Sequence, residues 1–419
     1  MTVPEDVVLL RLFGPEGRRD PYPFYGELLE RAPVLPVGGK RAVVMGFRES
    51  ADVLLNTRLF KVPDRDYADR SWPGWQEHPS TALLYRSLLF LNPPDNQPVR
   101  RLLSRSFHPG RVTLMRPMIE RQAAAHVAAL VADGSGADAA YSFTALPNSV
   151  MGELLGIPHD DMEQLAGWLD MFLERNELHS PDKPLRQADD AALRLAAYVR
   201  EKLLCAPAAD GASLVGSLAQ LGALDERDLV SNLVFVLGAG TVTTSSLLGS
   251  GLLHLARDNT LLRRLRDDDA LLTSFVLETL RHDPPVQYGA RVAVEDTELG
   301  GLRIARDSLV LVCLGALGRD PRRFPNPDTF VADRFTAPAA NPRDVLSFGL
   351  GTHRCAGAEL ALVTAEIAFR QLAQRIDTLA LAGPPQRQNR MVVRKFRRLE
   401  VQLSDACPRR KEDEDGQLL

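Results

Sequence analysis

Apolar side chains recur every three to four positions through the middle of the chain, the spacing of amphipathic helices. The pattern predicts helices over residues 114–132, 161–175 and 186–204. Residues 233–253 carry no charge and are expected to form a further, longer helix. Six serine and threonine hydroxyls and four glycines make this stretch too polar for lipid. It is therefore predicted to be a helix buried inside a protein.

Short apolar runs on either side of paired glycines predict two β-hairpins. In the first, residues 34–37 and 42–45 flank Gly38 and Gly39. The second follows Arg291 and turns at Gly300 and Gly301. The predicted fold is thus mainly α with small β-sheets.

No linker, repeat or change of composition divides the chain, so we predict a single domain over residues 1–407. The polar residues 408–419 are expected to form a tail. Residues 61–79, with Trp72 and Trp75, lack periodicity, and residues 176–184 join two helical segments. Both stretches are predicted to be loops over a pocket.

The 419 residues are 45% hydrophobic and 25% charged, which is typical of globular proteins and excludes disorder and coiled coils. A net charge of −4 gives no reason to expect nucleic-acid binding. The first residues resemble neither a signal peptide nor a membrane anchor. Four scattered cysteines suit a reducing compartment, so a cytoplasmic protein without membrane contact is expected.

One cysteine, Cys355, stands between a glycine-rich loop and a predicted helix, in the segment FGLGTHRCAG that runs from Phe348 to Gly357. Backbone N–H groups and the helix dipole stabilise a thiolate at such a position. Glycines let the backbone pass close to a flat, bulky partner. The segment therefore suits a metal-bound thiolate. The remaining cysteines are interpreted as small apolar residues: Cys205, Cys313 and Cys407.

This segment resembles the haem-binding signature F-G-x-G-x-H-x-C-x-G of the cytochrome P450 superfamily at every specified position. The resemblance implies a fold shaped as a triangular prism, with haem b between the long central helix and the cysteine loop. It implies that Cys355 is the axial iron ligand and that His353 pairs with a haem propionate. Phe348 would pack beside the sulfur, and Gly349 and Gly357 would shape the loop.

Further motifs of the family occur in the same order. Glu278 and Arg281 match its E-x-x-R, and Arg334 matches the third member of a structural triad. Arg291 and Arg100 match arginines that neutralise haem propionates. Asn96 stands where the family usually has histidine; its amide can donate a hydrogen bond but carries no charge.

The long helix contains Ala-Gly-Thr-Val-Thr-Thr from residue 239, which resembles the family's A-G-x-[D/E]-T with Val242 in place of the acid. The resemblance assigns oxygen activation to Ala239, Gly240, Thr243 and Thr244. Without the acid, proton delivery would depend on threonine hydroxyls, water or a hydroxyl group of the substrate.

The resemblance predicts a monomeric monooxygenase that inserts one oxygen atom into a small, largely apolar substrate in secondary metabolism. Electrons would come from a ferredoxin and its reductase, docking near Arg100, Arg101 and Arg354. Pocket residues implied by the resemblance are Leu237, Gly238, Val242, Val286, Tyr288 and Met391.

Three alternatives remain at this point. The missing acid makes an oxidative coupling or cyclising enzyme plausible on the same scaffold. A peroxide-driven enzyme is the second; the family members specialised for peroxide place an arginine in the long helix, and residues 233–253 contain none. The third alternative is a haem-binding sensor or module without catalysis.

Overall fold

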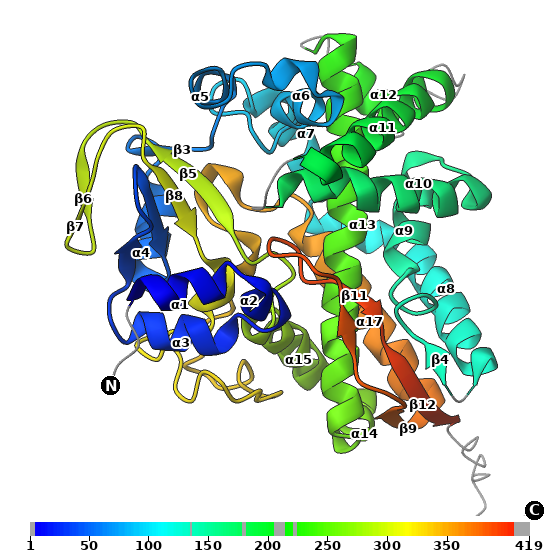
Figure 1. The fold of residues 1–419 in the computed structure, drawn as a ribbon. Coiled ribbons are helices and arrows are strands. Elements are labelled where there is room, and N and C mark those ends of the chain that lie inside the picture. The colour runs from blue at the N-terminus through cyan, green and yellow to red at the C-terminus, as the bar shows by residue number, and fades with distance from the viewer. Residues whose placement is uncertain (1–4, 135, 178–181, 205–213, 221–223, 406–419) are drawn as a thin grey trace, which may run out of the picture.

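Helices predominate over short strands in the computed structural model, which describes residues 5–134, 136–177, 182–204, 214–220 and 224–405 (Figure 1). The predicted class, mainly α with small sheets, is confirmed. The helices are α1 (Glu5–Leu12), α2 (Pro15–Arg19), α3 (Tyr22–Leu29), α4 (Phe47–Leu55), α5 (Arg65–Ser71), α6 (Pro79–Arg86), α7 (Gln97–Ser106), α8 (Pro109–Asp133), α9 (Leu146–Leu155), α10 (His159–Leu173), α11 (Asp182–Tyr198), α12 (Leu214–Ala219), α13 (Glu226–Arg257), α14 (Thr260–Asp267), α15 (Asp269–His282), α16 (Leu314–Leu317) and α17 (Ala358–Arg375). The strands are β1 (Val34–Pro36), β2 (Arg41–Val44), β3 (Phe60–Lys61), β4 (Ala137–Asp138), β5 (Gly289–Ala293), β6 (Thr297–Leu299), β7 (Leu302–Ile304), β8 (Leu309–Val312), β9 (Ile376–Leu381), β10 (Gln386–Arg387), β11 (Phe396–Arg398) and β12 (Glu400–Asp405).

Helix α13 runs through the middle of the molecule, with α9, α10, α15 and α17 packed around it (Figure 1). It begins earlier than predicted because the Asp225 side chain caps it, accepting a hydrogen bond from the Asp228 N–H. Among the described residues, α13 is the one helix long and apolar enough to cross a membrane, and 78% of its apolar window is buried inside the protein. The prediction of a long buried helix is therefore confirmed.

Both predicted hairpins form. Strands β1 and β2 pair antiparallel around Gly38 (φ 74°) and Gly39 (φ 57°), where only glycine adopts the left-handed backbone readily. Strands β6 and β7 pair around the second glycine pair. A five-stranded sheet of order β1-β2-β8-β5-β3 joins the N-terminal hairpin to the segment after α15.

The predicted helices over residues 114–132, 161–175 and 186–204 correspond to α8, α10 and α11. Helix α8 starts earlier than expected, at Pro109, whose fixed φ suits a first turn. Helix α10 gives way to a 3₁₀ turn at Glu174–Asn176, and α11 continues as a π-helical turn over Val199–Leu204.

The prediction of a loop over residues 61–79 is wrong in part, since the segment contains α5 and a 3₁₀ turn at Trp75–Glu77. Asp64 caps α5 by accepting from the Tyr67 N–H, and it also pairs with Lys61. Local capping, which apolar spacing does not report, forms this helix. Of the second predicted loop, residues 178–181 lie outside the described residues, as does the tail 408–419. The single domain over residues 1–407 stays a prediction.

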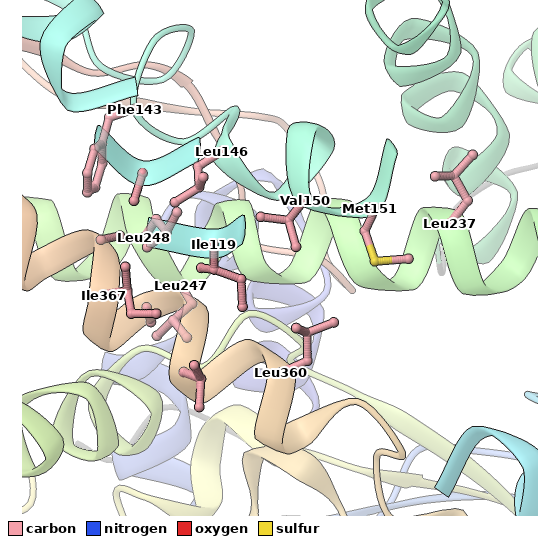
Figure 2. Packing of buried hydrophobic residues seen from close by; sticks show 14 of the residues in the cluster. Ile119, Phe143, Leu146, Val150, Met151, Leu237, Leu247, Leu248, Leu360 and Ile367 are labelled. Carbon is pink, nitrogen blue, oxygen red and sulfur yellow. The ribbon is translucent and has the colours of Figure 1, made fainter. Parts of the chain in front are cut away.

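The core brings side chains of several helices against α13 (Figure 2). Met151 of α9 lies above α13 and Leu360 of α17 below it in this view. A Cβ atom at Gly240 would lie 2.7 Å from the Met151 sulfur, so glycine at this position permits the close approach of α9.

Candidate active site

The middle of α13 is open on one side only. Between residues 236 and 255, Ala239, Gly240 and Thr243 are partly accessible while every other residue is buried. Because positions i, i+1 and i+4 share a helix face, accessibility confined to them in a buried helix indicates a hollow inside the protein.

An apolar cluster lies next to this open face. Val242 packs with Val392 and Val393 of the segment between β10 and β11, and Leu173 and Val286 pack against the three valines. A β-bridge joins Val286 to Val393. Valine in place of an acid thus packs into an apolar cluster beside the open face.

The other predicted pocket residues lie outside the Val242 cluster, and their role in substrate binding stays a prediction. Tyr288 and Met391 pack instead in a cluster beneath α1 and α3, with Tyr25 and Cys313. Leu237 is buried in the main core, and a Cβ at Gly238 would contact Leu169 and Leu173 of α10.

Val242 and Val286, two of the predicted residues, lie in this cluster, and Leu173, Val392 and Val393 join them without having been predicted. Val392 and Val393 are the two residues that follow Met391, and no periodicity distinguishes them from it.

The predicted tryptophans lie elsewhere. Trp75 is 5% exposed and donates its indole N–H to Asp69 at 2.7 Å. Trp72 stacks on His78, and the Arg175 guanidinium lies 4.4 Å from the Trp72 ring centre. Neither ring is in the cluster around Val242.

Two threonine hydroxyls in the middle of α13 bond back to its own backbone. Thr243 Oγ1 donates to the Ala239 carbonyl at 2.7 Å, and Thr241 Oγ1 donates to the Leu237 carbonyl at 2.9 Å. Thr241 and Thr244 are buried, so Thr243 is the accessible hydroxyl of the three. Such back-bonding keeps the Thr243 oxygen free to accept a further hydrogen bond from the hollow.

Cys355 lies in an accessible loop three residues before α17. Its N–H donates to the Phe348 carbonyl at 2.8 Å, which closes the loop, and Gly349 (φ 66°) and Gly351 (φ 67°) supply the left-handed turns. A Cβ at Gly351 would lie 2.8 Å from the Leu54 carbonyl oxygen, and one at Gly357 would meet nothing within 4 Å. No residue between 347 and 357 is buried.

Cys355 is solvent-accessible, yet burial is the largest influence on its thiol and raises its pKa. Both observations hold for a side chain that lines a recess, so that protein surrounds the sulfur while one side stays open. The Gly357 N–H and the charges of Arg354 and Arg100 oppose the shift. Metal coordination deprotonates a thiol outright, so this site suits a thiolate ligand whose charge the metal balances.

Three basic side chains gather beside the cysteine loop without an acidic partner among the described residues. Burial, then the charges of Arg291 and Arg100, lowers the pKa of His353 to about 4. Burial lowers the pKa of Arg291, which is 8% exposed, to about 10. Arg291 donates to the Ala290 carbonyl and Arg100 to the Arg354 carbonyl, both at 2.8 Å. A buried arginine without an acidic partner is costly, so Arg291, with Arg100 and His353 beside it, fits a bound anion.

Asn96 adds an unsatisfied donor at the start of α7. It is 1% exposed, and its buried Nδ2 has no hydrogen-bond partner within the described part of the chain. Together with the basic cluster and the recessed thiol, this donor fits the haem that the sequence resemblance implies, with its carboxylates on the cations and its iron on Cys355.

The predicted triad is brought together beneath the loop. Glu278 accepts from Arg281 at 2.6 and 2.8 Å and from Arg334 at 3.0 and 3.1 Å. Arg281 also donates to the carbonyls of Pro327 and Thr329. The Ser347 hydroxyl donates to the Leu280 carbonyl at 2.6 Å, which ties the start of the cysteine loop to α15. The triad thus fixes the approach to the loop and includes no residue of α13.

Comparison with known proteins shows similarity over nearly the whole chain. The family model described as Cytochrome P450 matches residues 213–402. Cytochrome P450 BJ-3 of Bradyrhizobium diazoefficiens is 33% identical over 94% of this chain and 95% of its own. Cytochrome P450 monooxygenase PikC of Streptomyces venezuelae is 32% identical over 92% of this chain and 90% of its own. The crystal structure of P450BioI in complex with acyl carrier protein ligated to hexadec-9Z-enoic acid superposes with a TM-score of 0.84, at 28% identity over 93% of this chain and 100% of that chain.

Proposed function

The chain belongs to the cytochrome P450 family of haem-dependent monooxygenases, and on that premise we propose that it inserts one oxygen atom into a small, largely apolar substrate. The observation that carries the proposal is the recessed Cys355 thiol beside the basic side chains Arg291, His353 and Arg100, which have no acidic partner among the described residues. These residues would hold haem b through its iron and carboxylates. When bound, the haem supplies the activation of molecular oxygen.

The residues of α13 would direct the reaction. One oxygen atom enters a C–H bond and the other leaves as water, which consumes two electrons and two protons. Thr243 Oγ1, the accessible hydroxyl on the open face, can accept a proton from water and pass one on. Val242, Val392 and Val393 exclude water from one wall and favour an apolar substrate.

The electrons would come from a separate ferredoxin through a basic groove on the surface near Cys355. Its volume is about 670 Å³, and its lining is Gln97, Arg100, Arg101, Ser104, Arg105, His108 and Arg111. None of the four arginines forms an ion pair among the described residues, and Arg100 reaches the Arg354 carbonyl beside Cys355. A groove with four cations and no acid is complementary to an acidic partner.

The proposal includes a soluble, monomeric, cytoplasmic enzyme of secondary metabolism. PikC, a relative named as a monooxygenase, supports the reaction class. A substrate bound to a carrier protein is a further option, since the solved P450BioI structure holds an acylated carrier protein.

Oxidative coupling without oxygen insertion is the second candidate, and Val242 favours it. Where no acid stands beside Thr243, proton delivery through the protein rests on fewer groups. Hydrogen abstraction followed by bond formation within the substrate would then compete with oxygen insertion.

Turnover under isotope-labelled oxygen gas separates the two. The haem-loaded protein would be supplied with a ferredoxin, its reductase and NADH and screened against apolar natural products. One labelled oxygen atom in the product supports monooxygenation, whereas loss of two hydrogens without label supports coupling. Intact haem reduction with no product from any compound would contradict both.

A further inference from the structure

A buried carboxylate lies where the end of α10 meets the segment between β10 and β11. Glu177 is 7% exposed and accepts hydrogen bonds from three consecutive backbone N–H groups. Its Oε2 accepts from Met391 at 2.5 Å and from Val392 at 2.8 Å, and its Oε1 accepts from Val393 at 3.3 Å. Both oxygens are therefore engaged by one short stretch of chain.

Charged contacts fasten the same stretch to α10. The Arg390 side chain, 6% exposed, donates to the Asp170 carboxylate at 3.1 and 3.2 Å and to the Asp170 carbonyl at 2.8 Å. It also donates to Glu174 at 3.2 Å. Lys395 lies 3.6 Å from Asp170. Residues 390–395 are thus held against the end of α10 from both ends.

The opposite side of this stretch is fixed to the segment after α15. The Gln287 N–H donates to the Val392 carbonyl at 2.8 Å, and Val393 forms its bridge with Val286. Val392 and Val393 then project into the cluster with Val242. The contacts of Glu177 therefore decide where two of the three central wall residues lie relative to α13.

The carboxylate form of Glu177 is what this geometry requires. Three backbone N–H groups donate to the two carboxylate oxygens. With glutamine at this position, the side-chain NH₂ would face a backbone N–H, and two donors cannot bond each other. Burial raises the pKa of Glu177, while the N–H groups of residues 391–393 and the charge of Arg390 oppose that shift. Burial disfavours the negative charge of Glu177, and the three backbone N–H groups stabilise that charge, so the carboxylate remains a hydrogen-bond acceptor.

We infer that Glu177 is a positioning residue for substrate selection, which sets the pocket wall by holding the backbone of residues 391–393 against the end of α10. The inference deepens the proposed function and rests on it only for the identity of the pocket. Glu177 does not itself reach the Val242 cluster and acts through Val392 and Val393.

Hydrogen exchange tests the positioning step without haem chemistry. In Glu177→Gln, the amides of residues 391–393 should exchange roughly five- to thirtyfold faster, the range expected for one lost buried hydrogen bond. Amides in the centre of α13 should be unchanged. Glu163→Gln, an exposed glutamate on α10, is the matched control and should leave residues 391–393 as in the unmodified protein. Unchanged exchange at 391–393 in Glu177→Gln would overturn the inference.

Binding of two haem ligands tests the effect on the pocket. Imidazole and the larger phenylimidazole both shift the Soret band, but the phenyl ring fills more of the pocket. Glu177→Gln should weaken phenylimidazole roughly fivefold or more and imidazole less than about twofold, because only the larger ligand depends on the wall. Equal weakening of both ligands would indicate a general structural role and contradict selection.

A second variant guards against misfolding of the first. In Asp170→Asn, Arg390 keeps its contacts with the carbonyl of residue 170 and with Glu174. This variant should therefore show the same changes in hydrogen exchange and ligand binding as Glu177→Gln, but smaller ones. If the unmodified protein gave no Soret shift with imidazole, the proposed function would fail, and the exchange experiment alone would decide the role of Glu177.

Discussion

The Thr243 hydroxyl donates a hydrogen bond of 2.7 Å to the carbonyl of Ala239, one helical turn earlier, on the one open face of α13. The neighbouring Val242 offers no proton, so this hydroxyl is the group of α13 best placed to handle protons in the hollow.

Thr243→Ala should therefore raise peroxide release per electron consumed and lower product formation, by about tenfold or more in coupling. NADH consumption, peroxide and product would be measured together. Thr113→Ala is the matched control, because Thr113 makes the same bond to the Pro109 carbonyl on the exposed face of α8. If coupling is the same in Thr243→Ala as in the unmodified enzyme, Thr243 is not in the relay and the non-inserting alternative gains support.

Cys355→Ser should abolish the shifted Soret band of the reduced, carbon-monoxide-bound protein, since a neutral hydroxyl does not replace thiolate donation to iron. Cys313→Ala should keep the band, because Cys313 is fully buried in the cluster beneath α1 and α3. Survival of the band in Cys355→Ser would show that another residue binds the iron.

Glu278→Ala should lower the free energy of unfolding by about 3–5 kcal/mol and reduce the yield of haem-bound protein, because it strands Arg281 and Arg334. Turnover per bound haem should change much less, since the triad includes no residue of the open face of α13. Denaturant titration and haem quantification provide the two readings.

The control is Glu153→Ala, whose pair with Arg121 is exposed and should contribute at most about 1 kcal/mol. Equal stability losses in the two variants would contradict the structural role of the triad.

Arg101→Glu and Arg105→Glu should slow electron transfer from an acidic ferredoxin by roughly tenfold or more at low salt. In the unmodified protein, the rate of electron transfer should fall as the salt concentration rises. Stopped-flow reduction over a salt series measures this. Arg303→Glu, an exposed arginine on β7, should have little effect. A rate that does not depend on salt, or equal effects of all three substitutions, would place docking elsewhere.

The stability of the protein should fall on acidification because the buried His254 and the half-buried His282 are held without charge. His254 stacks on Phe330 with ring centres 3.8 Å apart, and burial, followed by the charge of His282, lowers the pKa of His254 to about 3. Burial lowers the pKa of His282 to about 4. The unfolded chain binds these protons near pH 6.5, so between about pH 6.5 and 4 it holds more protons than the folded protein. The free energy of unfolding should therefore drop by about 1.4 kcal/mol per histidine for each pH unit in that window.

His254→Phe, which can keep the stack on Phe330, should flatten this slope. Denaturant midpoints between pH 7 and 4.5 would be compared with those of His159→Gln, an exposed histidine on α10. If the slope of His254→Phe equals that of the control, His254 is not responsible.

The sequence by itself determined the elements whose signal is local. The charge-free run indicated a long buried helix, paired glycines indicated both hairpins, and the loop at Cys355 pointed to a metal-bound thiolate. These follow from the side-chain period, from glycine's access to positive φ, and from the chemistry of one residue between a glycine loop and a helix.

Tertiary structure alone decided the contacts between distant segments. Val392 and Val393, rather than Met391 and Tyr288, join Val242, because the position of a hairpin segment over another helix has no local pattern. The helix α5 forms through the cap and ion pair of Asp64, which apolar spacing does not record. In the sequence, nothing distinguishes Glu177 from a surface carboxylate. It gains three hydrogen bonds only because the fold brings residues 391–393, more than two hundred positions later, into contact with it. Burial and hydrogen-bond partners depend on where the whole chain has placed its backbone, so no window of sequence around Glu177 contains them.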